Sequence, residues 1–333
     1  MVSGTSAAAF AAVRFAAGGV DLCFPPALEP KKERLNHLTS SIFVALVGRP
    51  NVGKSSLTNR LVGEKVAIVT SKPQTTRTRI TGIVTRGPVQ YVLLDTPGIH
   101  RARTKLGERM GKAAAESIAE VDAALMLFEP YGELNESEQA MIADIKAKKV
   151  PAIAVINKTD TLKSQADLAV RCAQLEALGV FEKVTAVSVR ADEHCEELFD
   201  LLLPYAVEGP HYFPDDAYTD MPEKALVAEV LREKMLLHLR DEIPHGIAVT
   251  VERFKERPDK PIIDIDVNIY CERKSHKGMV IGKGGQMLKT IASEARAECE
   301  EFLGAKVNLQ CWVKIKDDWR DNDFLLNNFG FQK

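Results

Sequence analysis

The 333-residue sequence has few cysteines, no long apolar run and no excess of charge of either sign. Its six cysteines are scattered and include no CxxC pair, which argues against a disulfide framework and against a zinc site. No apolar stretch approaches the roughly 20 residues that a membrane-spanning helix requires. The 44 basic and 46 acidic side chains give a net charge of −2, so no global field attracts nucleic acid. We therefore expect buried thiols in a reducing compartment, and any nucleic-acid site must be local.

Length and hydrophobic patterning predict two domains, each with its own core. From residue 41 onward, short apolar runs alternate with segments of helical length, and the runs are SIFVALVG, QYVLLDT, AALMLF, AIAVIN and KVTAVS. RITGIVT pairs with QYVLLDT through a turn at Arg86-Gly87-Pro88. This order predicts an α/β domain over residues 41–205, with a mostly parallel sheet covered by helices on both faces. Ligands of such sheets bind at the carboxyl ends of the strands.

The alternation stops at residues 206–222, where proline, glycine and acidic residues cluster, and we interpret this segment as a linker. Residues 223–333 predict a different order: a helix over 225–240, two strands, two helices around GKGG, and a last strand, KVNLQCWVKI. This is an α+β domain in the order αββααβ. We expect residues 1–40 to be a disordered extension. The first 22 residues are rich in alanine and have no acid before Asp21, so we leave import into an organelle open.

The segment GRPNVGKSS, residues 48–56, fits the pattern G-x-x-x-x-G-K-[ST] between an expected strand and an expected helix. Backbone N–H groups of such a loop, together with the helix N-terminus, stabilise phosphate oxygens. In this pattern Lys54 reaches the β- and γ-phosphates and Ser55 ligates Mg²⁺. The segment therefore predicts a site for a nucleoside triphosphate, and the alternative is a chance match.

Two more motifs follow expected strands. DTPG ends QYVLLDT, which places Asp95 to hold Mg²⁺ and the Gly98 N–H to sense a γ-phosphate. NKTD ends AIAVIN, which places Asp160 to accept from the ring N–H and the exocyclic amine of guanine, with support from Asn157 and Lys158. Adenine lacks that ring N–H, and a site built on hydrogen bonds rejects the wrong partner by about 10⁴ to 10⁵. GTP, not ATP, is the predicted nucleotide, although each motif alone also fits a turn or a loop cap.

The polar segment PQTTRTRI, residues 73–80, contains threonines that are able to reach the metal, and we choose Thr76 over Thr75. The alternative is a solvent-exposed loop whose threonines have no ligand. We expect GTP and Mg²⁺ to order residues 71–80, named here the switch segment, and residues 95–105. Such ordering would change how the first domain sits against the second, and so how well the second domain is exposed to its own ligand.

The second glycine loop, GKGG at residues 282–285, lacks the Ser or Thr that would bind a metal, and no expected strand feeds into it. A helix-GxxG-helix turn in the order αββααβ is typical of a KH domain, whose loop grips about four nucleotides of single-stranded RNA. Within residues 272–289 Glu272 opposes five basic residues, Arg273, Lys274, Lys277, Lys283 and Lys289, whereas acids and bases roughly balance over residues 223–333. This focused charge predicts RNA contact, and the alternative is a plain turn with a solvated basic face.

Taken in order, these segments resemble the Era family of ribosome-assembly GTPases, from about residue 41 to residue 331. The matching segments are GRPNVGKSS, PQTTRTRITGI, LLDTPGIH, INKTD, HYFPDD, VIGKGG and QCWVKIKDDW. The resemblance implies a P-loop GTPase domain followed by a type II KH domain that holds the 3′ region of 16S rRNA, in rRNA processing and 30S subunit biogenesis. It also implies a cytoplasmic protein that we expect to be a monomer, with peripheral association of some members with the inner membrane.

The motifs and the resemblance together assign functional residues. The GTP/GDP site takes Gly48, Arg49, Pro50, Asn51, Val52, Gly53, Lys54, Ser55, Ser56, Asp95, Thr96, Pro97, Gly98, Asn157, Lys158, Asp160 and Ser188. The predicted Mg²⁺ ligands are Ser55, Thr76 and Asp95, and the predicted catalytic residues are Lys54, Thr76 and Gly98. The predicted RNA-binding residues are Lys277, Gly282, Lys283, Gly284, Gly285 and Lys289.

Two positions bear on catalysis and base binding. Ile99 stands where many GTPases have a water-orienting glutamine, a feature the family shares, so hydrolysis should be slow and depend on the backbone, Mg²⁺ and, as a further candidate, K⁺ near Asn51. Ser188-Val189 departs from the family's Ser-Ala in the last guanine-contact loop. That departure puts in doubt the backbone contacts to the base there.

Two other function classes compete with this interpretation. One is a metabolic or signalling GTPase whose C-terminal domain binds protein, and the other is a passive RNA-binding scaffold with a structural nucleotide. A tRNA-modification GTPase is disfavoured by the KH-like order of the second half, and a double G-domain assembly factor by the single GxxxxGKS.

Overall fold

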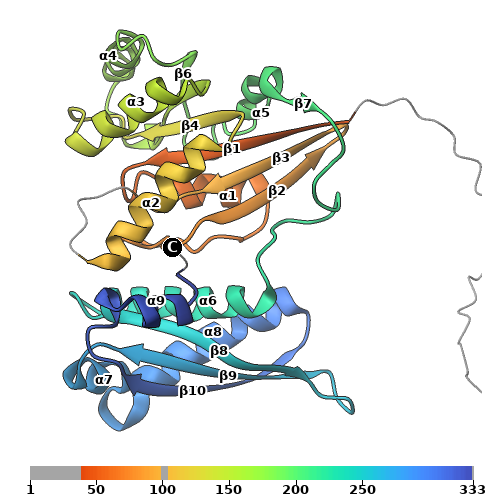
Figure 1. Cartoon of the computed structure of the whole chain (residues 1–333), viewed down its shortest axis with the longest axis vertical. Coiled ribbons are helices and arrows are strands. Elements are labelled where there is room, and N and C mark those ends of the chain that lie inside the picture. Colours follow the sequence, from red (N-terminus) through yellow and green to blue (C-terminus); the bar gives the residue numbers. More distant parts are fainter. Residues whose placement is uncertain (1–38, 99–103, 332–333) are drawn as a thin grey trace, which may run out of the picture. The chain divides into compact units, whose positions relative to one another are not determined.

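The computed structural model describes residues 39–98 and 104–331, which belong to one unit of the chain (Figure 1). The expected extension, residues 1–40, lies almost entirely outside the described residues. So do Ile99 and the middle of the second segment that we expect to respond to GTP, residues 99–103 of 95–105. The described residues confirm the two predicted folds, an α/β domain followed by an α+β domain.

The first domain is built on a sheet in the order β2-β3-β1-β4-β5-β6. Its strands are β1 (Ser40–Gly48), β2 (Ile80–Arg86), β3 (Val89–Asp95), β4 (Ala123–Phe128), β5 (Ala152–Ile156) and β6 (Lys183–Ala186). Pairing is parallel from β3 through β1, β4 and β5 to β6. It is antiparallel between β2 and β3, as expected for strands joined by a tight turn. Every residue of β3, β4 and β5 is buried, which explains why these strands read as continuous apolar runs.

Helices cover both faces of this sheet. They are α1 (Lys54–Val62), α2 (Lys105–Ala119), α3 (Glu136–Lys148), α4 (Gln165–Glu176) and α5 (Glu197–Leu202). One core cluster joins α1 and α5 to the sheet, and a second joins α2, α3 and α4 to its opposite face. The Thr104 side chain caps the first turn of α2 by accepting a hydrogen bond from the Gly107 N–H.

The segment interpreted as a linker is held against the first domain. Its residues Val207–Glu208 form β7, which pairs antiparallel with β1. Gln90 Oε1 accepts hydrogen bonds from the backbone N–H groups of Tyr212 and Phe213, and the Ile83 N–H donates to the Tyr218 carbonyl. The prolines and acids that end the helical pattern do not prevent an extended chain from pairing with a sheet.

The second domain packs a three-stranded sheet, in the order β10-β9-β8, under helices (Figure 1). Its main elements are α6 (Glu223–His238), β8 (Ile247–Glu256), β9 (Ile262–Cys271), α7 (Lys274–Ile281), α8 (Gln286–Leu303) and β10 (Lys306–Ile315). Short 3₁₀ turns include η3 (Pro244–Gly246), η4 (Lys283–Gly285) and η5 (Trp319–Asp321), and α9 (Asp323–Asn328) follows the last of them. The helix expected over 225–240 begins and ends two residues earlier.

One cluster forms the core of the second domain, from α6, α8 and the inner face of β8, β9 and β10. Among the described residues, Cys195, Cys271 and Cys299 are buried free thiols, as expected, whereas Cys172 and Cys311 are free thiols of intermediate exposure. Burial raises the pKa of the Cys299 thiol to about 12, so this group stays protonated. In the described part of the chain, every helix is too short or too polar to cross a membrane.

Candidate functional site

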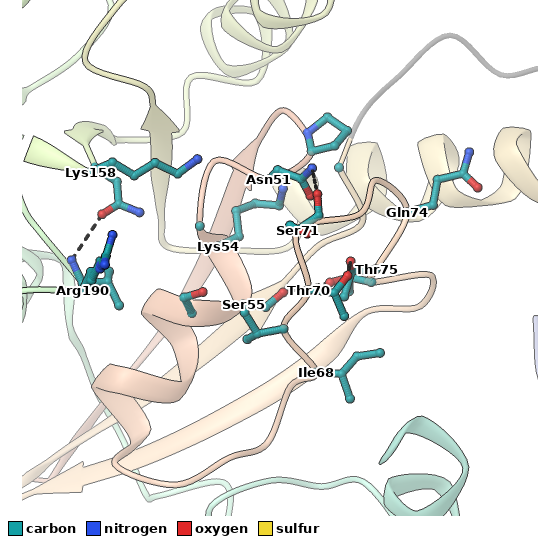
Figure 2. Close-up of a pocket in the computed structure, with 18 of the residues that line it drawn as sticks. Asn51, Lys54, Ser55, Ile68, Thr70, Ser71, Gln74, Thr75, Lys158 and Arg190 are labelled. Atoms are coloured by element: carbon teal, nitrogen blue, oxygen red, sulfur yellow. Dashed lines mark hydrogen bonds between the residues drawn. The ribbon is translucent and has the colours of Figure 1, made fainter. Parts of the chain in front are cut away.

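A cavity of about 540 Å³ lies at the carboxyl ends of β1, β3 and β5. Its walls come from the loop before α1, the switch segment, Gly98 and the loops after β5 and β6. Lys158 and Arg190 lie at one end of it, and Lys54 and Ser55 lie between them and Thr70 and Thr75 (Figure 2). The fold thus gathers motifs that are more than 100 residues apart in one place, where a ligand of this sheet type is expected.

The Lys54 side chain bonds back to the backbone of the loop before α1. The Lys54 ammonium donates to the Gly48 and Arg49 carbonyls, each at 3.0 Å. Burial lowers the pKa of Lys54 to about 8, and nearby Asp95 offsets part of that shift. Gly53 adopts a φ of +105°, and a Cβ there would lie 2.2 Å from the Asn157 amide nitrogen. Only glycine fits this position, because a side chain would be strained and would collide.

Three oxygen-bearing side chains converge beside Lys54. Ser55 Oγ donates to Asp95 Oδ2 at 2.6 Å and lies 2.9 Å from Thr76 Oγ1. Asp95 is fully buried, and within the described residues its other oxygen, Oδ1, has no hydrogen-bond partner. Burial raises the pKa of Asp95 to about 6, against the opposing effects of Lys54 and the two hydroxyls. A buried carboxylate oxygen without a partner costs free energy unless a cation or another donor satisfies it.

The loop after β5 is built to hold a carboxylate still. Ser188 Oγ donates to Asp160 Oδ1 at 2.8 Å, and Asn157 Nδ2 donates to the Val52 carbonyl at 2.9 Å. Lys158 has a φ of +64°, a left-handed conformation that non-glycine residues rarely adopt. The Asn157 bond connects the Asp160 end of the cavity to the loop before α1, because Val52 belongs to that loop.

Some residues predicted for the nucleotide site do not line the cavity. Thr96 points inward and donates to the Leu46 carbonyl at 2.7 Å, and Ser188 supports Asp160 from behind. Gly48, Arg49, Val52, Asp95 and Pro97 are likewise outside the cavity lining. These residues shape the site from a second layer.

Other cavity residues were not predicted from the sequence. They are Ile68, Val69, Thr70, Ser71, Gln74, Thr75, Thr161, Val189 and Arg190. Asn51 explains part of this wall, since its Nδ2 donates to the Ser71 carbonyl at 2.7 Å and so joins the two loops (Figure 2). Val189 and Arg190 directly follow Ser188, so they lie in the loop that the sequence had already indicated as the last guanine-contact loop.

Glu129, which follows β4, is a second feature that the motifs did not reveal. Its Oε1 accepts from Lys158 Nζ at 2.8 Å, and its Oε2 accepts from the Arg49 guanidinium. One carboxylate therefore joins the loop before α1 to the loop after β5. The sequence carries no local signal for this role, since the partners lie 29 and 80 residues away.

The second glycine loop lies at the turn between α7 and α8 and is open to solvent. Gly282, Gly284 and Gly285 all have positive φ, at 75°, 60° and 79°. A Cβ on Gly282 would meet Met287 at 2.6 Å, whereas a Cβ on Gly284 or Gly285 would meet nothing within 4 Å. Gly282 is thus needed for packing, and the other two glycines keep the turn conformation and leave the backbone approachable.

The basic residues around this turn have no acidic partners in the described part of the chain. Lys283 and Lys289 are exposed, and Lys277 is half-buried. Arg320 pairs with Glu272 at 2.6 Å, which removes the one acid of this stretch from the basic group. Unpaired cations beside an exposed backbone turn suit contact with phosphates.

Comparison with known protein families agrees with both halves of the site. Residues 43–158 match the family described as 50S ribosome-binding GTPase, and residues 242–320 match the KH domain family. The first match contains the two motifs at the ends of the cavity, GRPNVGKSS and the start of NKTD. The second contains GKGG.

Curated relatives cover almost the whole described chain. The GTPase Era of Clostridioides difficile is 46% identical over 289 residues, which is 87% of this chain and 97% of that protein. The GTPase Era of Alkaliphilus metalliredigens is 43% identical over 290 residues, again 87% of this chain and 98% of the relative.

Two solved structures have the same fold at 34% identity, each with a TM-score of 0.85 over 89% of this chain and 100% of the other. One is Aquifex aeolicus Era bound to GDP and AlF₄⁻, and the other is Era in complex with MgGDPNP and nucleotides 1506–1542 of 16S ribosomal RNA. Identity of this extent over both domains exceeds what a shared fold alone requires, and the chain belongs to the Era family of GTPases.

Proposed function

We propose that this GTPase uses Mg²⁺ and GTP to control how its second domain holds the 3′ region of 16S rRNA, during rRNA processing and 30S subunit biogenesis. The observation that carries the proposal is that one chain has a guanine-type cavity and an exposed GKGG turn with unpaired cations. A solved Era structure that matches both domains of this chain is described as a complex with MgGDPNP and a 16S rRNA fragment.

The residues at the cavity fit Mg²⁺. Ser55, Thr76 and Asp95 present oxygen atoms within 3.4 Å of one another, and the buried Asp95 Oδ1 has no partner among the described residues. Hard oxygen donors of this kind suit Mg²⁺, which keeps several waters and bridges to phosphates. When bound, the ion would offset the negative charge that develops on the phosphates during hydrolysis.

The chain's own residues position the substrate. Asp160, held by Ser188, accepts from the guanine ring, while Lys54 donates to phosphate oxygens from a buried position. The backbone of Gly98 approaches the first loop so closely that a Cβ there would lie 2.8 Å from Pro50. This approach is suited to a backbone N–H that meets a γ-phosphate at the far side of the cavity.

K⁺ near Asn51 is part of the same proposal. Asn51 has a φ of +64°, and its side-chain amide donates to the Ser71 carbonyl, so Asn51 joins the loop before α1 to the switch segment beside the cavity. A monovalent cation there would stabilise the charge between the phosphates. We further propose a monomer in the cytoplasm, with peripheral attachment at the cytoplasmic face of the cell membrane as the second location to test.

Gly284→Asp tests the proposal, because Gly284 is exposed and lies far in sequence from the nucleotide motifs. GTP turnover and binding of a labelled oligonucleotide with the 16S rRNA 3′ sequence would be measured for the wild type and the variant, with and without a GTP analogue, in K⁺ and in Na⁺. We expect the variant to lose RNA binding and keep its turnover. RNA binding that survives intact would favour a protein-binding C-terminal domain, and tight GDP binding with no turnover in any condition would favour a passive scaffold.

The same measurement tests the coupling between the two sites. A ligand shifts only an equilibrium whose states it distinguishes. Equal RNA affinity of the wild type with GTP analogue, with GDP and without nucleotide would therefore refute control by GTP, even if both ligands bind.

A further inference from the structure

We propose that Arg77 is a positioning residue through which the second domain holds Thr76 at the metal-binding oxygens of the first. Arg77 lies in the switch segment, next to Thr76, and neither motif nor resemblance assigns it a role. The inference rests on the proposed role of Thr76 in binding Mg²⁺. It adds the element that keeps Thr76 in place.

Arg77 is almost completely buried, at 4% exposure, and its guanidinium lies within the second domain. It donates to three backbone carbonyls around η3 and the start of β8: Ile247 at 2.6 Å, His245 at 2.9 Å and Pro244 at 3.2 Å. Its guanidinium carbon lies 5.9 Å from the centre of the Trp319 ring. Three carbonyl acceptors at one guanidinium form a specific socket, which a lysine with its single ammonium would fill less well.

Other contacts hold the same stretch of chain from the second domain. The Arg232 guanidinium of α6 donates to the Thr75 carbonyl, and Lys72 Nζ donates to the Leu239 carbonyl just after α6. Just before the switch segment, the Val69 N–H donates to a carboxylate oxygen of α6 at 2.9 Å. The second domain therefore holds the segment on both sides of Thr76, and Arg77 is the anchor next to it in the chain.

Adjacent residues of this segment face different domains. Thr76 Oγ1 lies 2.9 Å from Ser55 Oγ and 3.4 Å from Asp95 Oδ2, both in the first domain. Arg77, one residue later, is bonded to the second domain. Any loosening of the Arg77 contacts must therefore be transmitted through one peptide bond to the hydroxyl that faces the metal position.

Truncation of Arg77 would leave three buried carbonyls without their donors and release the segment from its anchor. The population of chains with Thr76 in place would fall, and the apparent affinity for Mg²⁺ would fall with it. GDP affinity should change little, because none of the Arg77 contacts reaches the base or the first loop.

Arg77→Ala tests the inference, and Arg79→Ala is the matched control. Arg79 lies two residues away, is about half exposed, and pairs loosely with Glu120 at 3.8 Å. The first readout is backbone hydrogen exchange of residues 72–80 in protein without nucleotide or Mg²⁺. We expect faster exchange in Arg77→Ala and wild-type exchange in Arg79→Ala.

The second readout is the Mg²⁺ concentration that gives half-maximal GTP turnover. We expect an increase of about tenfold for Arg77→Ala, the effect of one strong hydrogen-bonded group, with GDP affinity within about twofold. Unchanged exchange and an unchanged Mg²⁺ requirement, relative to Arg79→Ala, would overturn the inference. If Arg77→Ala does not fold, Lys72→Ala decides, since it removes a partly exposed contact of the same set and should change both readouts in the same direction.

Thr76→Ala separates this inference from the function on which it rests. A Mg²⁺ requirement that stays the same in Thr76→Ala refutes the metal role of Thr76 itself. A requirement that rises in Thr76→Ala but not in Arg77→Ala keeps the metal role and refutes only the anchoring by Arg77.

Discussion

The two glycine loops of this chain differ in how closely other atoms pack against their glycines. In the first loop, glycines make room for the protein: a Cβ on Gly53 would lie 2.2 Å from Asn157, and one on Gly48 would lie 2.7 Å from the Leu127 carbonyl. In the second loop, only Gly282 is packed in this way, against Met287, and a Cβ on Gly284 or Gly285 would meet no atom within 4 Å. Glycine count and spacing therefore cannot tell a closed loop from an open one, and the surroundings decide which ligand each serves.

The difference extends to the charged groups. Lys54 of the first loop is 5% exposed and bonded to backbone carbonyls, whereas Lys283 of the second is exposed and unpaired among the described residues. A buried, oriented cation suits a small ligand that enters a cavity and is recognised atom by atom. An exposed cation suits a polymer whose phosphates slide along a surface.

The largest expected effect is on nucleotide preference, at the end of the cavity where Asp160 lies. Asp160→Asn exchanges two acceptor oxygens for one acceptor and one donor, so it no longer accepts from both guanine donors but can donate to the 2-oxo group of xanthine. We expect a change in preference of about 10⁴ toward xanthine nucleotides, the range for sites that select by hydrogen bonds. Competition binding of GDP against xanthosine diphosphate measures it, and unchanged guanine affinity would remove Asp160 from base recognition.

The next effect tests the closed character of the first loop. Gly53→Ala places a methyl group against Asn157 in a backbone conformation that L-residues rarely adopt, at a cost of about 3 kcal/mol. If this free energy destabilises the loop conformation that binds nucleotide, GDP affinity decreases by about 100-fold. Fluorescent-GDP titration checks this, and affinity near the wild-type value would show that the loop is not held as tightly as its contacts suggest.

A smaller effect tests the open character of the second loop, with two substitutions at one position. Gly284→Ala meets no atom within 4 Å, so its cost is limited to the left-handed backbone, about 1 kcal/mol. Gly284→Asp adds a negative charge to the same strain, and we expect RNA affinity at least about tenfold below that of Gly284→Ala. Equal losses in the two variants would assign the effect to the backbone conformation and not to phosphate contact.

Much of both domains could be predicted from the sequence because the signals are local. Apolar runs gave the parallel strands, and GRPNVGKSS, DTPG and NKTD each lie at the end of a strand, so a parallel sheet brings them to one edge. The contacts that escaped prediction are long-range: Arg77 bonds to residues about 170 positions away, and Gln90 to residues more than 120 away. An arginine in a polar loop has the same local appearance whether it faces solvent or is buried in another domain.

The same limit applies to charge. Arg77 and Arg79 share a segment and a residue type, yet one is buried against three carbonyls and the other is exposed. Tertiary contacts between elements far apart in the chain make that distinction, and no periodicity within the segment records it.

The smallest effect concerns Glu129. Its carboxylate joins two parts of the nucleotide site, the loop before α1 and the loop after β5. Glu129→Gln keeps the shape but removes the charge that pairs with Lys158 at 2.8 Å and with Arg49. The side chains of this group are about one third exposed, so solvent screens the pairing, and its loss is worth about 0.7 kcal/mol. We expect GDP to dissociate about threefold faster in stopped-flow measurements, because the loops at the two ends of the cavity are no longer joined. Glu133→Gln, at an exposed acid four residues later, is the control. Equal dissociation rates in both variants would mean that Asn157 alone couples the two loops, through its hydrogen bond to the Val52 carbonyl.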